Sequence, residues 1–273
     1  MEIEGRQVST IISEIISIGR ELLIGRTQNT NATWISSQLL SVGIEVSRIS
    51  VVGDSVYEIS RAVLESIARR PSIIITTGGL GPTYDDLTVE GIASALKIPK
   101  TLNPKALEQV RSKYQSMGLE MTPPRYKMAM LLEGAEPLAN ALGTAPGMMI
   151  EYGGTTIFSL PGVPSEMMEM FSSQVLPRIT EKVPRKRFLE RVIVIEGIPE
   201  SSLAPLIEEW MPSSGGVYLK SHPAGREPSP TLKVHLSIIG DNSEEMRSLL
   251  SRAEESFIKY VLKAGGKIKE AQI

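Results

Sequence analysis

The sequence predicts an α/β protein in which a mostly parallel sheet is sandwiched by helices, with a second, smaller α+β domain after it. Short apolar runs such as residues 73–75 have the length of interior parallel strands, and they alternate with segments whose apolar residues keep helical spacing. A glycine-rich segment, residues 78–81, joins one such strand to a helix. Because open α/β sheets bind ligands at the carboxyl ends of their strands, this loop is the first place to expect a site.

The elements before this loop alternate regularly between strand and helix. We expect strands at residues 14–18, 44–52 and 73–75, and helices at residues 31–42 and 56–69. The connections between them are short, which implies right-handed crossovers and a parallel sheet covered on both faces. After the loop we expect helices at residues 87–96, from the Asn103-Pro104 cap to Met117, and after Pro164, and a hairpin at the sheet's edge made of residues 148–152 and 155–160.

The chain is expected to form two domains, residues 11–181 and 188–273, joined by the basic segment Lys182–Arg187. In the second domain we expect strands at 188–196, 217–219 and 231–239 and a helix at 201–210, with a last helix capped by Asn242. The loop at residues 222–230 would either fold over a ligand or simply be mobile.

Composition narrows the classes of function. The 273 residues carry a net charge of -2, which gives no global attraction to nucleic acid or anionic lipid. No apolar run approaches the roughly 20 residues that span a bilayer, so we expect a cytoplasmic protein with a small-molecule partner. With no cysteine and only His222 and His235, a zinc site is not expected, and any metal should be a hard ion such as Mg²⁺.

Two adjacent carboxylates, Asp85 and Asp86, follow the glycine-rich segment. Glycine amides can approach anionic oxygens closely through positive φ, whereas two carboxylates repel a phosphorylated ligand unless a cation lies between them. A divalent metal resolves this conflict. The alternative is that the aspartates only cap the following helix, which would account for one of them.

Three segments are predicted to end strands at the same edge of the sheet: the glycine-rich loop, residues 19–31 and Gly53-Asp54. Each alone is ordinary turn chemistry, and Asn31 alone could be a helix N-cap. Together they predict a polar rim of the kind at which nucleotides bind.

These residues resemble the CinA family in unbroken order over about residues 14–180, through Glu21-Leu22-Leu23, Gly78–Thr83 with Asp85-Asp86, Gly143–Gly147 and Leu160–Met167. The resemblance implies a first domain with the fold of the molybdopterin-binding MoaB and MogA proteins, a KH-like second domain and a homodimer. It also implies Mg²⁺-dependent hydrolysis of the diphosphate of ADP-ribose or a related nucleotide. Family members with a further C-terminal domain deamidate nicotinamide mononucleotide, an activity not expected of a chain ending at Ile273.

The resulting set of candidate residues has three parts. Asp85, Asp86 and Lys127 are the candidate catalytic residues, with Arg125 as an alternative cation, and Asp54, Asp85 and Asp86 are the candidate metal ligands. Candidate ligand-binding residues are Gly19, Glu21, Asn29, Asn31, Gly53, Asp54, Gly78, Gly79, Leu80, Gly81, Pro82, Thr83, Asn140, Gly143, Thr144, Pro161, Gly162 and Glu166.

Two departures from the family pattern, Arg20 and Met128, bear on ligand choice. Related proteins of the same fold handle molybdopterin through similar glycine-rich loops, so the fold does not fix the substrate. Two other functions therefore stay open: a molybdopterin-binding or nucleotidyl-transfer protein, and a non-enzymatic nucleotide-binding module. Nucleic-acid binding is not expected, because residues 188–273 lack a Gly-x-x-Gly loop with basic flanks.

Overall fold

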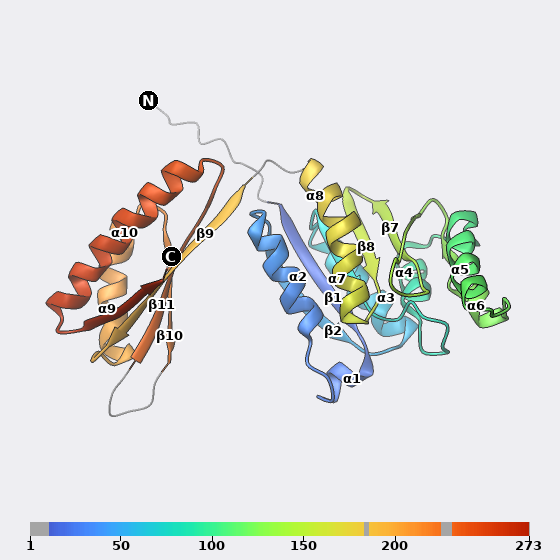
Figure 1. Ribbon diagram of the computed structural model, residues 1–273, viewed down its shortest axis with the longest axis horizontal. Helices are drawn as coiled ribbons and strands as arrows, with labels where there is room; N and C mark the ends of the chain where they lie inside the picture. Colours follow the sequence, from blue (N-terminus) through green and yellow to red (C-terminus); the bar gives the residue numbers. More distant parts are fainter. Residues whose placement is uncertain (1–10, 183–185, 225–230, 273) are drawn as a thin grey trace. The chain divides into compact units, whose positions relative to one another are not determined.

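The computed structural model describes residues 11–182, 186–224 and 231–272 (Figure 1). The chain divides into two compact units whose boundary along the sequence falls between residues 183 and 184. Within the described residues, no helix is both long and apolar enough to cross a membrane.

A six-stranded sheet forms the centre of the first unit, in the order β2-β1-β3-β8-β7-β6. The neighbours β2, β1, β3 and β8 run parallel, while β7 and β6 are antiparallel to their neighbours. The strands are β1 (Ile12–Ile18), β2 (Glu45–Val52), β3 (Ile73–Thr77), β6 (Glu136–Leu138), β7 (Gly147–Tyr152) and β8 (Thr155–Leu160).

The predicted hairpin forms, but its expected position at the sheet's edge is wrong. Strand β8 pairs in parallel with β3 and lies in the interior, and the short strand β6 makes the edge. Every residue of β8 is buried, which fits an interior strand. This position matters because it brings the carboxyl end of β8, followed by Pro161, beside the glycine loop that follows β3.

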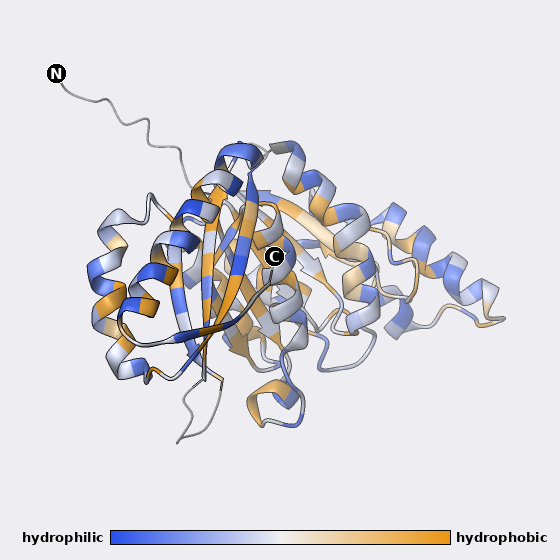
Figure 2. Ribbon diagram, turned by 60° about the vertical axis from the view of Figure 1, so that its left-hand side comes forward, coloured by the Kyte–Doolittle hydropathy of each residue, from blue (hydrophilic) through white to orange (hydrophobic). Residues whose placement is uncertain are grey.

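Helices cover both faces of this sheet, with α2 and α7 on one face and α3 and α4 on the other (Figure 1). The strands are mostly hydrophobic, whereas the helices mix hydrophobic and hydrophilic residues (Figure 2). The helices of this unit are α1 (Arg20–Leu23), α2 (Thr30–Ser41), α3 (Val56–Ala68), α4 (Thr88–Leu96), α5 (Pro104–Ser116), α6 (Pro123–Lys127), α7 (Pro164–Met170), the π-helix η1 (Phe171–Val175) and α8 (Leu176–Lys182). A two-stranded sheet of β4 (Lys100–Leu102) and β5 (Met130–Leu132) stands beside them.

The second unit is a four-stranded antiparallel sheet in the order β10-β11-β9-β12, with two long helices. Its core includes Trp210 and Phe257, whose rings pack edge to face at 5.2 Å. The final strand was not predicted, and residues 225–230 of the loop discussed above lie outside the described chain. The elements are β9 (Arg187–Glu196), α9 (Glu200–Trp210), the 3₁₀-helix η2 (Met211–Ser213), β10 (Tyr218–Pro223), β11 (Thr231–Gly240), α10 (Ser243–Lys263) and β12 (Lys267–Gln272).

A nearly buried ion pair joins the first strand to the end of α3. Arg69 donates two hydrogen bonds to the carboxylate of Glu14, at 2.7 and 2.6 Å, and the Glu14 side chain is only 3% exposed. Burial by itself would raise the pKa of Glu14, but the hydrogen bonds and charge of Arg69 outweigh it and lower that pKa. Glu14 therefore stabilises the fold only while it is ionised.

Removing the guanidinium should leave a buried, unpaired carboxylate. We expect Arg69→Met to reduce the free energy of unfolding by about 2–3 kcal/mol at pH 7, while Arg61→Met, which breaks the exposed Arg61–Glu65 pair, should cost much less. Because the folded pKa of Glu14 lies below its unfolded value, the contribution of the pair is complete above the unfolded pKa. It is lost as the pH falls through the folded pKa. Urea unfolding at pH 7 and pH 3 measures this, and an Arg69→Met deficit that does not shrink at pH 3 would contradict it.

Candidate functional site

The glycine loop leaves the end of β3 in a conformation that other residues would not tolerate. Gly78 has φ +98°, and a Cβ there would lie 2.2 Å from the carbonyl oxygen of Ile18 on the neighbouring strand. Thr88, at the start of α4, secures the turn by donating its hydroxyl to the Gly78 carbonyl at 2.7 Å and its N–H to the Gly79 carbonyl at 3.1 Å. The loop is thus fixed against both the sheet and the helix that follows.

The loop presents three consecutive main-chain donors with no acceptor. Within the described chain, the N–H groups of Gly79, Leu80 and Gly81 make no hydrogen bond. Unpaired amides in folded proteins are satisfied by water or by a ligand. Three successive donors in a glycine-rich turn form a binding site for anionic oxygens.

A cavity of about 430 Å³ lies at this end of the strands, and the loop forms one of its walls. Five carboxylates line it, and the described residues of its lining include no lysine, arginine or histidine. They come from four different segments of the first unit: Glu21, Asp54, Asp85, Asp86 and Glu166. The cavity is therefore strongly acidic although its glycine wall is suited to anions.

Three of these carboxylates lie directly against glycine α-carbons. A Cβ atom on any of these three glycines would collide with a carboxylate oxygen. The distance would be 2.3 Å between Gly19 and Glu21, 2.6 Å between Gly81 and Asp86, and 2.0 Å between Gly143 and Glu166. Of the three loop glycines, Gly78 and Gly79 take positive φ and Gly81 does not. Gly81 serves instead to admit the carboxylate.

The two adjacent aspartates converge on one hydroxyl. Asp86 accepts from the Thr83 N–H at 2.8 Å, and its Oδ2 lies 2.6 Å from Thr83 Oγ1, which is also within hydrogen-bonding distance of Asp85 Oδ1. The hydrogen bond from the Thr83 hydroxyl is the largest cause of a lowered pKa at Asp85. The alternative that they cap α4 is wrong, because the N-cap is Leu87 and no side chain makes a cap hydrogen bond there; both aspartates instead line the cavity.

Asp54 is held apart from this pair. Its Oδ2 accepts the N–H of Arg20 at 2.7 Å and so fixes the start of α1. Among the described residues, no group of three or more Asp, Glu, His or Cys is arranged to hold a metal ion. A site in which Asp54, Asp85 and Asp86 bind one ion by themselves is therefore not preformed. As a donor set, the carboxylates of the exposed Asp85 and the half-buried Asp86 fit Mg²⁺, which usually takes one or two carboxylates and completes its shell with phosphate and water.

The two cations proposed for the site are engaged elsewhere. Lys127 donates to the carbonyl oxygens of Thr83 and Asp86, each at 2.6 Å, and so clamps the acidic loop without lining the cavity. Arg125 lies over the ring of Tyr114 at 4.1 Å and donates to the Glu120 carbonyl. Lys127 is a positioning residue here, and its charge also contributes to the lowered pKa of Asp85.

The two candidate asparagines serve the walls of the cavity. Asn29 accepts hydrogen bonds from the Ser17 hydroxyl at 3.1 Å and the Ala32 N–H at 3.4 Å. Asn31 lies in the first turn of α2, so its assignment as an N-cap is wrong, and it donates to the Gly162 carbonyl at 2.8 Å. That bond connects the segment after β8 to α2 across 131 residues of sequence.

Asn140 organises another wall, the loop formed by residues 139–146. Its amide donates to the Ala145 carbonyl at 2.9 Å and to Glu166 at 2.7 Å, and its oxygen accepts the Gly143 N–H at 2.6 Å. Asn140 is buried and does not line the acidic cavity, but it orients Glu166, which does.

Most candidate residues meet in this cavity, and a few lie behind it. Gly53, Pro82 and Gly143 adjoin lining residues in sequence, while Ile18, Ala145 and Val163 line the cavity without having been predicted. Their apolar side chains carry no chemical signal in the sequence, so only the fold places them. The candidates that line the cavity are Gly19, Glu21, Asp54, Gly78, Gly79, Leu80, Gly81, Thr83, Asp85, Asp86, Thr144, Pro161, Gly162 and Glu166.

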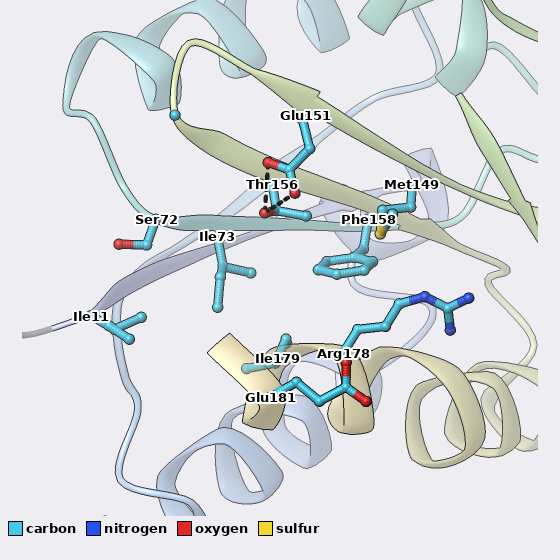
Figure 3. Close-up of a pocket in the computed structure, with 11 residues that line it drawn as sticks. Ile11, Ser72, Ile73, Met149, Glu151, Thr156, Phe158, Arg178, Ile179 and Glu181 are labelled. Atoms are coloured by element: carbon cyan, nitrogen blue, oxygen red, sulfur yellow. Dashed lines mark hydrogen bonds between the residues drawn. The ribbon is translucent and has the colours of Figure 1, made fainter. Parts of the chain in front are cut away.

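A separate cavity of about 370 Å³ lies at the amino ends of β3 and β8 (Figure 3). Ile73, Phe158 and Ile179 point into it, and its rim carries Glu151 and Arg178. Two of the three charged side chains that line it already have protein partners: Thr156 donates its hydroxyl to Glu151, and Arg178 pairs with Glu136 at 2.5 Å. The third is the exposed Glu181. None of the candidate residues lies there, so the acidic cavity is the better candidate for the functional site.

Comparison with known proteins defines the class. Residues 14–181 match the family described as the probable molybdopterin binding domain, and the chain belongs to that family. A protein of Aeropyrum pernix is 47% identical over 257 residues, which cover 94% of this chain and 96% of the relative. A protein of Pyrobaculum aerophilum is 44% identical, with 92% of this chain and 94% of the relative covered.

A solved structure gives the more particular likeness. The crystal structure of the protein CinA of unknown function from Thermoplasma acidophilum is 37% identical and has a TM-score of 0.57; the match covers 61% of this chain and 96% of that one. The first unit is therefore a CinA-like domain with the molybdopterin-binding fold, as the sequence predicted.

The close contact at Gly78 predicts a specific sensitivity of the fold. Gly153→Ala, at φ +57° with open space around it, should cost about 1–2 kcal/mol for the left-handed conformation alone. Gly78→Ala carries the same strain and a clash with the Ile18 carbonyl, so we expect a loss larger by at least about 1 kcal/mol. Parallel denaturant unfolding of both variants measures the difference, and equal losses would show that the close approach is not tight.

The Thr83 hydroxyl predicts a titration. In a carbon-detected NMR titration the pKa of Asp85 should lie below its usual value, and Thr83→Val should raise it because the largest stabiliser of the carboxylate is gone. Thr83→Ser keeps a hydroxyl and should keep the low pKa. A valine variant that titrates like the wild type would contradict the role given to Thr83.

Proposed function

We propose that this protein binds a phosphorylated ligand at the acidic cavity together with a divalent cation, Mg²⁺ by the chemistry of its donors. One observation carries the proposal: three unpaired amides suited to phosphate share a cavity with five carboxylates and, among its described lining residues, no basic side chain. A phosphate bound to the amides of Gly79 to Gly81 needs a counter-charge against Asp85 and Asp86. Asp85 and Asp86 would hold the cation, which would supply that charge.

The family description favours molybdopterin, or a nucleotide-linked form of it, as the ligand class. In this function the glycine amides bind the phosphate, Asp85 and Asp86 hold the cation, and Glu21 and Glu166 accept hydrogen bonds from polar groups of the ligand. Lys127 and Thr83 keep the acidic loop in place. The protein would then either bind this ligand or transfer a nucleotidyl group to it.

Hydrolysis of ADP-ribose is the second candidate, and the open position of the aspartates favours it. Asp85 is exposed and, like any aspartate with an ordinary or lowered pKa, is ionised at neutral pH, so it can orient a water molecule beside a bound diphosphate. The water oxygen would attack one phosphorus, the bond from that phosphorus to the bridging oxygen would break, and AMP and ribose 5-phosphate would leave. The cation offsets the negative charge that develops in this reaction.

Two assays on the same preparation test the proposal. Binding of molybdopterin is followed by calorimetry, and release of AMP from ADP-ribose by chromatography, both with Mg²⁺. We expect Asp86→Asn to reduce binding or turnover at least tenfold. Asp241→Asn, an exposed aspartate of the second unit, should change neither.

The outcomes separate the candidates. Saturable molybdopterin binding without AMP release supports the binding protein, and AMP release that depends on Asp86 supports the hydrolase. If the wild-type protein neither binds molybdopterin nor splits ADP-ribose, the proposed function is wrong. If Asp86→Asn behaves like the wild type, the role given to this carboxylate is wrong.

A further inference from the structure

A neighbouring cavity of about 510 Å³ lies between α5 and the 139–146 loop. Gln109, Ser112 and Ser116 line it from the helix, and Ala141 and Pro146 line it from the loop. Its volume falls within the range of small-molecule sites, roughly 300–1,000 Å³. Apart from Asn140 and Thr144, which it shares with the wall of the acidic cavity, it contains none of the candidate site residues.

The two cavities adjoin at the same loop. Thr144 lines both of them, and Asn140, which lines the neighbouring cavity, is hydrogen-bonded to Glu166 in the acidic one. A small crevice of about 10 Å³ lies beside both, because it shares Pro146 with the neighbouring cavity and Gly79 and Asp86 with the acidic cavity. Thr144 is therefore the point at which the neighbouring cavity lies next to the glycine loop's cavity.

The wall between the cavities is held from several sides. Gln174 of the π-helix accepts the Ala139 N–H at 2.8 Å and donates back to the Ala139 carbonyl, which fixes the start of the loop. Lys113 of α5 donates to the Ala141 carbonyl, and Asn140 forms hydrogen bonds with Ala145 and Gly143 within the loop. These contacts pre-form the shape that a ligand would meet, which lowers the ordering cost of binding.

Gln109 adds an unsatisfied polar group to this cavity. Its Oε1 atom is buried and has no hydrogen-bond partner among the described residues. Such a group costs free energy until a partner reaches it. Rotation of the amide presents either an N–H donor or an oxygen acceptor, which are the two groups that the edge of a nitrogen heterocycle requires.

From this arrangement we propose that the neighbouring cavity receives the fused nitrogen heterocycle of the ligand, a purine or pterin ring, while the phosphates occupy the acidic cavity. The inference rests on the proposed function and extends it by assigning the two ends of the ligand to two cavities. The Pro146 ring and the short side chains of Ala141 and Ser112 offer surface for the ring faces. Gln109 binds the ring edge.

A substitution on the exposed face of α5 tests this without touching the acidic cavity. Ser112→Trp places a large side chain over the neighbouring cavity, and Gln115→Trp places the same side chain on the same helix at an exposed position outside the lining. Dissociation constants are measured with Mg²⁺ for three probes: ADP-ribose, neopterin triphosphate and inorganic pyrophosphate, which has no ring.

We expect Ser112→Trp to weaken binding of at least one ring-bearing probe tenfold or more and to leave pyrophosphate affinity within twofold. Gln115→Trp should change none of the three. The probe that loses affinity identifies the ring as purine or pterin. If Ser112→Trp binds all three probes as the wild type does, this inference is overturned while the proposed function stands. If the wild type binds none of the probes, both are overturned.

Discussion

The site depends on one electrostatic conflict at the carboxyl ends of the central strands. Three main-chain amides of the loop after β3 have no acceptor, whereas five carboxylates line the same cavity and no cationic side chain among the described residues does so. The two nearest basic groups are used otherwise, Lys127 on loop carbonyls and Arg125 on an aromatic ring. Phosphate and carboxylate can share this cavity only if a small multivalent cation lies between them. The proposed binding of a phosphorylated ligand therefore requires that cation.

The fold holds the walls of this site together through hydrogen bonds between residues that lie far apart in the sequence. Asn31 connects α2 to Gly162, Asn140 connects the 139–146 loop to Glu166, and Gln174 fixes the beginning of that loop. Glycines at positions 19, 81 and 143 let three carboxylates approach the main chain more closely than any other residue would permit. These contacts pre-form the acidic cavity. Binding of a ligand and its cation there would therefore require little rearrangement of the protein.

The structural features that could be predicted from the sequence are those that contiguous residues specify. The glycine-rich turn, the Asp85-Asp86 pair and the alternation of strands and helices are contiguous patterns, so the parallel sheet and the edge that carries the site follow from them. The location of β8 was not predictable, because a hairpin pattern is the same for an interior and an edge strand. The edge strand β6 has three residues, one of them proline, too short to give a period-two signal.

The roles of several candidate residues also required the structure. Asn31, Asn140 and Lys127 are polar and lie near the site, and sequence alone could not show that each forms a hydrogen bond with a distant segment. Asp54 was grouped with the aspartate pair because Gly53-Asp54 ends a strand, yet its carboxylate is committed to the start of α1. In each case a long-range hydrogen bond, which no local pattern reports, decides the role.

The most direct measurement is the affinity of the protein for inorganic pyrophosphate as a function of free Mg²⁺. We expect no measurable pyrophosphate binding in excess EDTA and saturable binding when Mg²⁺ is added. In the Asp85→Asn/Asp86→Asn double variant, Mg²⁺ should no longer increase pyrophosphate binding. Pyrophosphate that binds wild-type protein equally well in EDTA and in Mg²⁺ would show that the amides hold phosphate without a cation, and it would contradict the central claim.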